Sequence, residues 1–290
     1  MFVRMASPER IVHVDDIDIC VQTFGDRADP ALLLLAGAGS SMLSWTDEFC
    51  ERLAAGRRFV IRFDWRDTGR SVTYPPGAAG YTAADLAADA VGVLDAFGIE
   101  RAHVVGLSMG GGFAQLIALD QPERVASLVL MSTSAAPFDP ELPAMSPELL
   151  EFYLSERQVD WADRDSVIAY LADHARRLAS PARTFDTEAA RAAAAKEFDR
   201  ATNIESVNNH PPRSDGVSRK DELAGITAPT LVLHGTDDPL FPFPHGEALA
   251  NAIPGARLLA VAFTGHELPP ESTWGQVIPA IIDHSAPSNS

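Results

Sequence analysis

The sequence places one serine where it could act as a nucleophile. Ser108 stands at the centre of Gly-Leu-Ser-Met-Gly, residues 106–110. An apolar run over residues 102–105 predicts a short buried strand before it, and apolar residues at helical spacing over residues 113–119 predict a helix after it. So tight a strand-to-helix turn needs glycine two positions either side of the serine, because larger side chains would collide. The pattern predicts a strained serine with its hydroxyl exposed at a helix N-terminus.

A serine of this kind needs a base, and His266 is the best-placed histidine. A serine hydroxyl is a poor nucleophile unless a base takes its proton and an acid orients that base. His266 follows one predicted strand and precedes the last predicted helix, so it lies on a loop that can reach the nucleophile. His174 and His210 fall in a helical segment where they could line a substrate. Histidines inside predicted strands fit the role less well: His13, His103 and His234.

The acid that orients the base is expected at the end of a strand between Ser108 and His266. Residues 231–239, Leu-Val-Leu-His-Gly-Thr-Asp-Asp-Pro, offer Asp237 and Asp238. Asp238 is preferred, because the proline after it restricts it to an extended conformation that could hold the carboxylate steady. Asp237 remains the alternative.

A developing oxyanion needs hydrogen-bond donors that are already in place. One is expected to be the backbone N–H of Met109, directly after the nucleophile. The other is expected from the Gly-Ala-Gly loop at residues 37–39, which follows an apolar strand at residues 32–35 and can approach closely. We assign this second donor to the backbone N–H of Ala38.

The elements that must position these residues alternate between strands and helices over the first ~130 residues, which predicts a mostly parallel sheet with helices on both faces. Thr82 with Asp85 three positions later predicts the start of one helix, and Gly98 its end. A first hairpin is predicted at residues 10–14 and 17–24. The other predictions for this half are strands at 32–35, 59–63, 102–105 and 127–131 and a helix at 45–54.

A helical stretch interrupts this pattern between residues 135 and 223. Helices are predicted at 147–157, 166–178 and 187–201, without a convincing strand. The sheet pattern then resumes with a strand at 230–233, a helix at 246–252, a strand at 257–261 and a helix at 272–282. We therefore expect an α/β core, residues 1–136 and 224–290, with an inserted helical cap, residues 137–223.

The composition of the chain argues against several classes of binding partner and cofactor. The formal net charge of −17 argues against binding nucleic acid or an anionic membrane. No apolar run approaches the ~18–20 residues of a membrane span, and the first residues hold no apolar segment of signal-peptide length. The two cysteines form no disulfide framework, which favours the cytoplasm. No histidine–cysteine cluster has metal spacing and no phosphate-binding glycine loop stands out, so we expect neither metal nor other cofactor.

A polar turn at residues 64–71, Asp-Trp-Arg-Asp-Thr-Gly-Arg-Ser, follows a predicted strand. We interpret its residues as a brace for the active-site loops and leave them out of the catalytic set.

These segments carry a resemblance to a known family. The chain is similar to the α/β-hydrolases over essentially its whole length, because the 106–110 motif, Asp-Pro at 238–239 and Gly-His at 265–266 occur in that family's order and context. It resembles most the aclacinomycin methylesterase-like branch, through the turn at 64–71, Ala-His-Val-Val-Gly-Leu-Ser-Met-Gly at 102–110 and Pro-His-Gly at 244–246. Many α/β-hydrolases carry glycine where this chain has Asp67, and this difference is one reason why the chain resembles that branch more than others.

The resemblance implies ester hydrolysis, with bulky polyketide methyl esters among the family's substrates. Ser108 would be the nucleophile, His266 the base and Asp238 its orienter. The chain departs from the family at residues 36–37, where Ala-Gly replaces the His-Gly of many relatives, and in the cap region, which matches least well.

We therefore expect a serine hydrolase that cleaves a neutral, hydrophobic carboxylic ester through an acyl-enzyme. Carbon–carbon bond hydrolysis, lactone opening and perhydrolysis would use the same triad and remain open, because residues of the cap decide among them. A ligand-binding protein without turnover, built on a hydrolase scaffold, is the alternative from another class. The expected partner is a small molecule, and the sequence does not indicate an oligomeric state.

Overall fold

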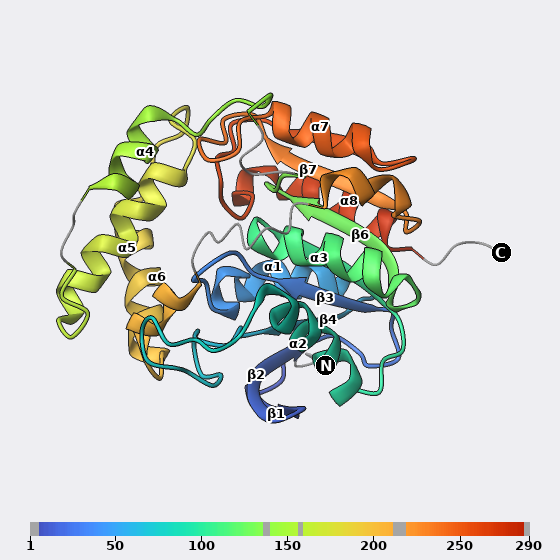
Figure 1. Ribbon diagram of the computed structural model, residues 1–290, viewed down its shortest axis with the longest axis horizontal. Helices are drawn as coiled ribbons and strands as arrows, with labels where there is room; N and C mark the ends of the chain where they lie inside the picture. Colours follow the sequence, from blue (N-terminus) through green and yellow to red (C-terminus); the bar gives the residue numbers. More distant parts are fainter. Residues whose placement is uncertain (1–5, 136–139, 156–158, 211–218, 287–290) are drawn as a thin grey trace.

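Eight strands form one sheet at the centre of the computed structural model, which describes residues 6–135, 140–155, 159–210 and 219–286 (Figure 1). The strand order is β1-β2-β4-β3-β5-β6-β7-β8. β2 is antiparallel to β1 and β4, and all other neighbours are parallel. The strands are β1 (Arg10–Val14), β2 (Ile17–Phe24), β3 (Ala31–Leu35), β4 (Phe59–Phe63), β5 (Ala102–Leu107), β6 (Val125–Met131), β7 (Thr230–Gly235) and β8 (Arg257–Val261).

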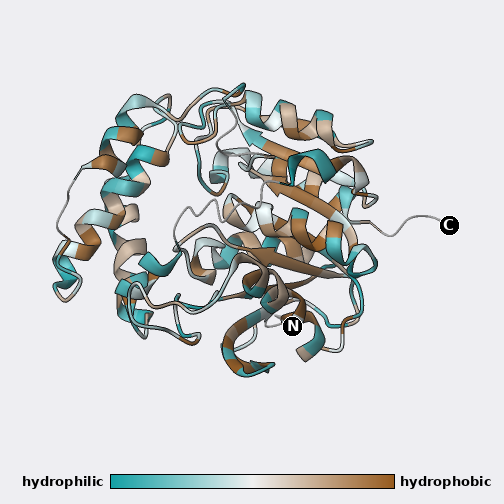
Figure 2. Cartoon of the chain, viewed as in Figure 1, coloured by the Kyte–Doolittle hydropathy of each residue, from teal (hydrophilic) through white to brown (hydrophobic). Residues whose placement is uncertain are grey.

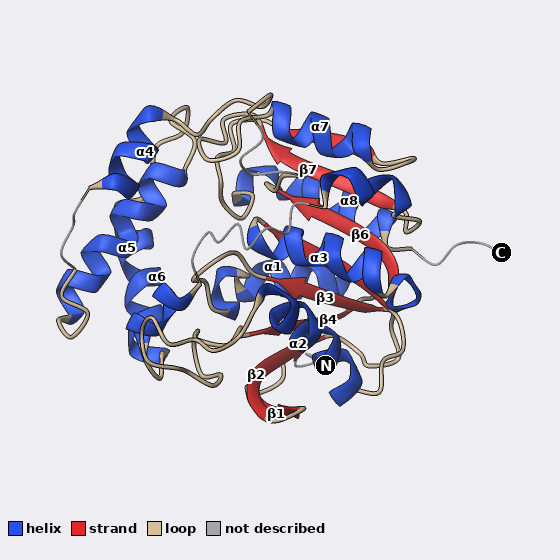
Figure 3. Ribbon diagram, viewed as in Figure 1, coloured by secondary structure: helices blue, strands red, loops and turns tan. Residues whose placement is uncertain are grey.

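Helices cover both faces of the sheet (Figure 3). α2 and α3 lie in front of the sheet in this view, and α1 and α8 lie behind it. The helices are α1 (Asp47–Ala55), α2 (Ala83–Ala96), α3 (Met109–Asp120), α4 (Pro147–Leu154), α5 (Arg164–Leu178), α6 (Thr187–Arg200), α7 (Pro244–Ala252) and α8 (Trp274–His284). The predicted architecture, a mostly parallel sheet flanked by helices, is confirmed.

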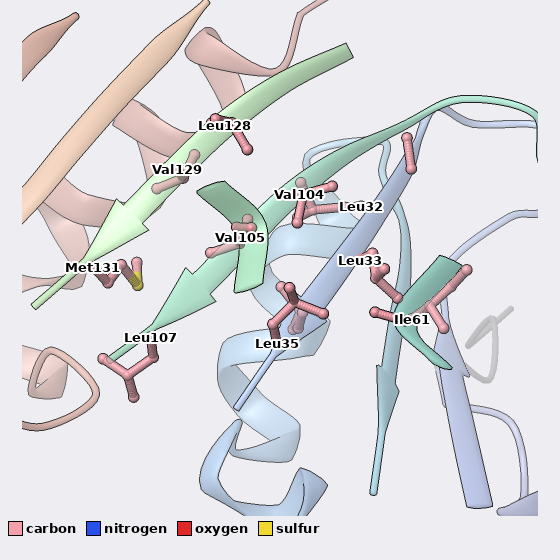
Figure 4. Close-up of a cluster of buried hydrophobic side chains, with 14 of the residues drawn as sticks. Leu32, Leu33, Leu35, Ile61, Val104, Val105, Leu107, Leu128, Val129 and Met131 are labelled. Carbon is pink, nitrogen blue, oxygen red and sulfur yellow. The ribbon is translucent and has the colours of Figure 1, made fainter. Parts of the chain in front are cut away.

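The core lies along the middle strands. Every residue of β5 is buried, because helices cover it on both sides, and its sequence is accordingly almost continuously apolar. Side chains of β3, β5 and β6 gather there, among them Leu33, Val104 and Val129 (Figure 4). Hydropathy colouring shows the same distribution, with the most hydrophobic residues in the sheet and mixed character in α4 and α5 (Figure 2). This rigid centre positions the loops at the carboxyl ends of the strands.

Local signals set the ends of α2. The Thr82 side chain accepts a hydrogen bond from the Asp85 N–H, and the Asp85 carboxylate accepts one from the Thr82 N–H, a complete capping box. At the other end, Gly98 adopts φ +64°, which glycine takes without strain. Both predictions for this helix are confirmed.

Several other elements begin or end one to three residues from their predicted positions, α1, α4 and β5 among them. α1 begins at Asp47 and not at residue 45, because the Thr46 side chain caps it by accepting from a backbone N–H. α4 ends at Leu154, and residues 156 and 157, the last two of the predicted helix, lie outside the described chain. β5 runs to Leu107, two residues beyond its predicted end, so Ser108 follows the strand directly.

The stretch between β6 and β7 holds α4, α5 and α6, which stand to one side of the sheet (Figure 1). α5 and α6 pack against each other along their length, and α4 packs on α5. In the part of the chain that is described, no helix is long and apolar enough to cross a membrane. Residues 137–139 and 211–218, which belong to the expected cap, lie outside the described residues.

A buried ion pair fastens α6 to the sheet. The Asp64 carboxylate, fully buried after β4, accepts from the Arg200 guanidinium at 2.7 and 3.0 Å. It also accepts from the backbone N–H groups of Met42 and Arg70, both at 2.9 Å. One carboxylate therefore ties together the loop after β3, the turn after β4 and the end of α6. These bonds agree with the interpretation of the 64–71 turn as a brace for the active-site loops, which stays a prediction.

Candidate active site

Ser108 occupies a strained turn between β5 and α3. Its backbone has φ 53° and ψ −118°, and residues other than glycine rarely adopt a positive φ. The surroundings fix this geometry: the Ser108 N–H donates to the Met131 carbonyl at 2.9 Å, and the Thr133 hydroxyl donates to the Ser108 carbonyl at 2.8 Å. The turn points the serine hydroxyl away from the sheet, as the motif predicts.

The flanking glycines are required by close backbone approaches. A Cβ on Gly106 would lie closer than 3.0 Å to the backbone of Gly110, and a Cβ on Gly110 would lie closer than 3.0 Å to the carbonyl oxygen of Leu35. By contrast, a Cβ on Gly112, one turn into α3, would meet nothing within 4 Å. The predicted collision is therefore confirmed at both positions.

These contacts predict opposite outcomes for two glycine substitutions in α3. Gly110→Ala should lower the free energy of unfolding by about 1–3 kcal/mol, because the new methyl group is forced against backbone that cannot swing away. Gly112→Ala should raise it by up to about 1 kcal/mol, because alanine is the better helix former and the space is open. Urea denaturation of both variants measures the difference, and a Gly110→Ala protein as stable as Gly112→Ala would contradict the steric argument.

His266 lies beside Ser108, on the loop after β8. Its Nε2 is 2.8 Å from the Ser108 Oγ, and its Nδ1 is 2.9 and 3.1 Å from the two carboxylate oxygens of Asp238. With Nδ1–H donating to Asp238, Nε2 is left as the acceptor for the serine hydroxyl. The backbone is held as well, because the His266 N–H donates to the Leu178 carbonyl at the end of α5, at 2.7 Å.

The structure brings Asp238, and not Asp237, to the histidine. The buried Asp238 carboxylate follows β7, and its Oδ1 accepts from the backbone N–H groups of Leu240 and Phe241 at 2.9 and 2.8 Å. These bonds fix the carboxylate in the orientation that His266 needs. The Asp237 carboxylate instead accepts from the Ser180 hydroxyl. The geometry therefore agrees with the preferred choice of acid.

His234 lies behind Asp238 and has no counterpart in the sequence-based prediction of the site. Its Nε2–H donates to the Phe241 carbonyl at 2.7 Å and lies 3.7 Å from the Asp238 Oδ2. Burial lowers its pKa below the usual value for histidine, which favours the neutral ring. A Cβ on Gly246 would collide with this imidazole. His234 therefore packs beneath the acid as a neutral support, fitted against a glycine of α7.

The two expected oxyanion donors border the serine. A Cβ on Gly37 would lie 3.6 Å from the Ser108 Cβ, so the loop after β3 passes directly beside the nucleophile. Met109 is the first residue of α3, where helix N–H groups have no partner within the helix. Among the described residues, neither the Ala38 N–H nor the Met109 N–H meets a backbone acceptor. Neither N–H is therefore occupied by a backbone acceptor from the described residues, and the assignment of both as oxyanion donors stays a prediction.

The loop that carries Ala38 is held by a residue from the stretch between β6 and β7. The Gly39 N–H donates to the His210 Nδ1 at 3.3 Å. Beside it, the Asn209 amide donates to the Asp67 carboxylate at 3.0 Å, and the Tyr81 hydroxyl donates to the same carboxylate at 2.6 Å. The buried Asp67 carboxylate thus accepts from both Asn209 and Tyr81 and joins their segments of the chain.

The chain is similar to known proteins over most of its length. The model of the family described as alpha/beta hydrolase fold matches residues 30–273. Two rhodomycin D methylesterases, from Streptomyces sp. (strain C5) and Streptomyces peucetius, are 38% and 37% identical over 283 residues, 90% of this chain and 93% of theirs. A putative carbamate hydrolase from Variovorax paradoxus is 33% identical over 84% of this chain and 88% of its own.

Solved structures show the same fold. A hydrolase from Pseudomonas aeruginosa superposes with a TM-score of 0.67 at 27% identity, over 95% of this chain and 96% of its own. A meta-cleavage product hydrolase from Pseudomonas fluorescens gives a TM-score of 0.77 at 20% identity, over 95% and 96% of the two chains.

Proposed function

The chain belongs to the α/β-hydrolase-fold family and is a hydrolase of carboxylic esters, and within that class we propose that it cleaves neutral, hydrophobic esters through an acyl-enzyme on Ser108. The observation that carries the proposal is the continuous line of hydrogen bonds from Asp238 through His266 to the Ser108 hydroxyl. Such a line is what acyl transfer by a serine requires.

In the proposed mechanism the Ser108 Oγ attacks the ester carbonyl while the His266 Nε2 takes its proton. Asp238 stabilises the imidazolium that forms and keeps Nδ1 protonated. The backbone N–H groups of Ala38 and Met109 donate to the oxyanion of the tetrahedral intermediate. His266 then gives its proton to the leaving alcohol, and a water molecule, activated by the same histidine, hydrolyses the acyl-enzyme. The mechanism uses no cofactor.

The helices between β6 and β7 serve, in this proposal, as the cap that selects the substrate, with residues 137–223 as cap and residues 1–136 and 224–290 as core. The bond between His266 and Leu178 supports it, because it places the end of α5 against the catalytic loop. The Phe241 ring, 5.4 Å from the His266 ring, adds an apolar surface beside the reacting atoms. A cap with aromatic residues suits a hydrophobic ester.

The relatives' names favour ester hydrolysis over the other reactions that this triad permits. Both rhodomycin D methylesterases are named for cleaving a methyl ester. The meta-cleavage product hydrolase is 20% identical, so its likeness shows the fold alone and gives carbon–carbon hydrolysis no support. We therefore propose a small-molecule hydrophobic ester, with a methyl ester as the first candidate.

The proposed compartment is the cytoplasm. Cys20 and Cys50 are free and buried, and burial raises the pKa of each thiol to about 12. Thiols with so little thiolate character react slowly with oxidants and disulfides. Free cysteines of this kind suit a reducing compartment.

The test is covalent labelling with a serine-directed phosphonate ester. An activated Ser108 should take up one equivalent, seen as a single mass increase of the intact protein, and the modified peptide should contain Ser108. A His266→Ala protein, which keeps the serine and loses the base, should label far more slowly. No adduct, or an adduct on another residue, would support a ligand-binding protein without turnover and overturn the proposal.

A further inference from the structure

A hydrogen-bonded pair of side chains, Tyr153 on α4 and His174 on α5, lies close to the proposed triad. The Tyr153 hydroxyl and the His174 Nε2 are 2.9 Å apart. His174 precedes Leu178 by four residues, about one turn of α5, and the Leu178 carbonyl accepts from the His266 N–H. The Tyr153–His174 pair therefore lies about one helical turn from the contact between α5 and the catalytic loop.

Electrostatic coupling points to the same placement. Burial first, and then a positive charge on His266, lowers the pKa of His174, and burial first, then Tyr170 and Asp238, raises the pKa of Tyr153. Coulomb interactions weaken with distance and are screened by water, so both partners lie within reach of the triad's field.

The aromatic residues around His174 hold it in a fixed orientation. The Phe152 ring stacks on the imidazole with a centroid distance of 5.5 Å and an interplanar angle of 2°. Tyr170 stacks on Phe152 in turn, at 5.8 Å and 17°. Packing of this kind removes the rotational freedom of the imidazole before a ligand arrives, and pre-organisation strengthens a hydrogen bond to that ligand.

The pair is neutral and has hydrogen-bonding capacity to spare. Burial lowers the pKa of His174 to about 4, so the imidazole is uncharged at neutral pH. A tyrosine hydroxyl can donate once and accept twice, and the bond to His174 uses one of these capacities. Tyr153 is 43% exposed, so a ligand can reach its side chain. A neutral imidazole can accept from or donate to the phenol, which lets the phenol offer a ligand either a lone pair or its proton.

We propose that Tyr153 and His174 form a recognition subsite for a neutral oxygen, a hydroxyl or a carbonyl, on the body of the ester that Ser108 cleaves. The inference rests on the proposed function and adds to it a substrate class: a hydrophobic ester with an uncharged oxygen remote from the scissile bond. A carboxylate is disfavoured there, because the Tyr153–His174 pair is neutral and the protein carries a formal net charge of −17. The Arg177 guanidinium over the Phe152 ring is already paired with Glu148 and Asp173. Phe152 and Tyr170 supply aromatic surface next to this oxygen.

The test compares matched pairs of aryl methyl esters, in which one member carries a ring hydroxyl or ketone at varied distances from the ester and the other lacks it. The wild-type protein should prefer one oxygenated member by about 3–15-fold in kcat/KM, the gain of one hydrogen bond, mainly through KM. Tyr153→Phe keeps the ring and removes the hydroxyl, so it should bring that ratio to about 1. Tyr170→Phe, which removes a phenolic oxygen from the neighbouring ring, should keep the ratio.

Each outcome separates this inference from the proposed function. If wild-type protein cleaves the esters without preferring any oxygenated member, or if Tyr153→Phe slows both members of a pair equally, the Tyr153–His174 bond only joins α4 to α5. If wild-type protein cleaves no ester, the proposed function fails. The affinity of Ser108→Ala protein for the same ester pairs, with and without Tyr153→Phe, then decides whether the subsite binds the oxygen.

Discussion

Replacing Ser108 with alanine should lower kcat/KM on p-nitrophenyl butyrate by about 10³–10⁶-fold, the scale seen when a catalytic triad loses a member. The variant keeps the oxyanion donors and can still bind the substrate, but it lacks the hydroxyl oxygen that would form the acyl-enzyme. Residual hydrolysis would come from water that His266 activates. Initial rates over a range of substrate concentrations, measured with wild-type and variant protein side by side, give the ratio.

The fold must survive this change for the ratio to be informative. Alanine fills less space than serine and needs no hydrogen bond from the site, so the melting temperature should stay within a few degrees of the wild-type value. A variant that unfolds cooperatively at the same temperature but retains more than a few per cent of the activity would show that another residue is the nucleophile.

The second large effect is expected at the acid. Asp238→Asn should lower kcat by about 10⁴-fold, because an asparagine amide in place of the carboxylate favours the wrong histidine tautomer and cannot stabilise the imidazolium. Asp237→Asn is the matched control. Its carboxylate accepts from the Ser180 hydroxyl and does not bind His266, so kcat should change by less than about 10-fold.

Both variants preserve side-chain size, so differences in rate reflect the charge and the hydrogen bonds. Kinetics with p-nitrophenyl butyrate at saturating concentration measures kcat for each protein. Equal losses in the two variants, or a larger loss in Asp237→Asn, would reverse the assignment of the acid and would mean that the Asp238–His266 bond is not used in turnover.

The sequence predicted those parts of the molecule that depend on neighbouring residues. Apolar runs predicted the strands, and the 106–110 motif predicted the turn at Ser108, because glycine, strand and helix are consecutive there. The capping box at Thr82 is equally local. The position of His266 could be predicted as well, because a loop after the last strand lies at the same sheet edge as the nucleophile.

Local sequence patterns did not predict contacts between distant segments of the chain. Asp64 and Arg200 are separated by 136 residues, and no local pattern marks an arginine at the end of a surface helix as the partner of a buried carboxylate. The sequence pattern at His234 predicts only a buried strand residue, although its imidazole supports Asp238. The Tyr153–His174 bond depends on how α4 packs on α5, which helical periodicity does not specify. Assignment of Ala38 and Met109 as oxyanion donors stays a prediction.

The distance along the chain between nucleophile and base has a consequence for how the protein is made. His266 follows Ser108 by 158 residues. At typical synthesis rates of about 5–20 residues per second, the serine is added to the chain about 8–30 seconds before the histidine. During that interval the serine has no partner to take its proton, so a nascent chain cannot be acylated by its own substrate. The enzyme becomes active only when β8 has joined the sheet and brought His266 to the turn.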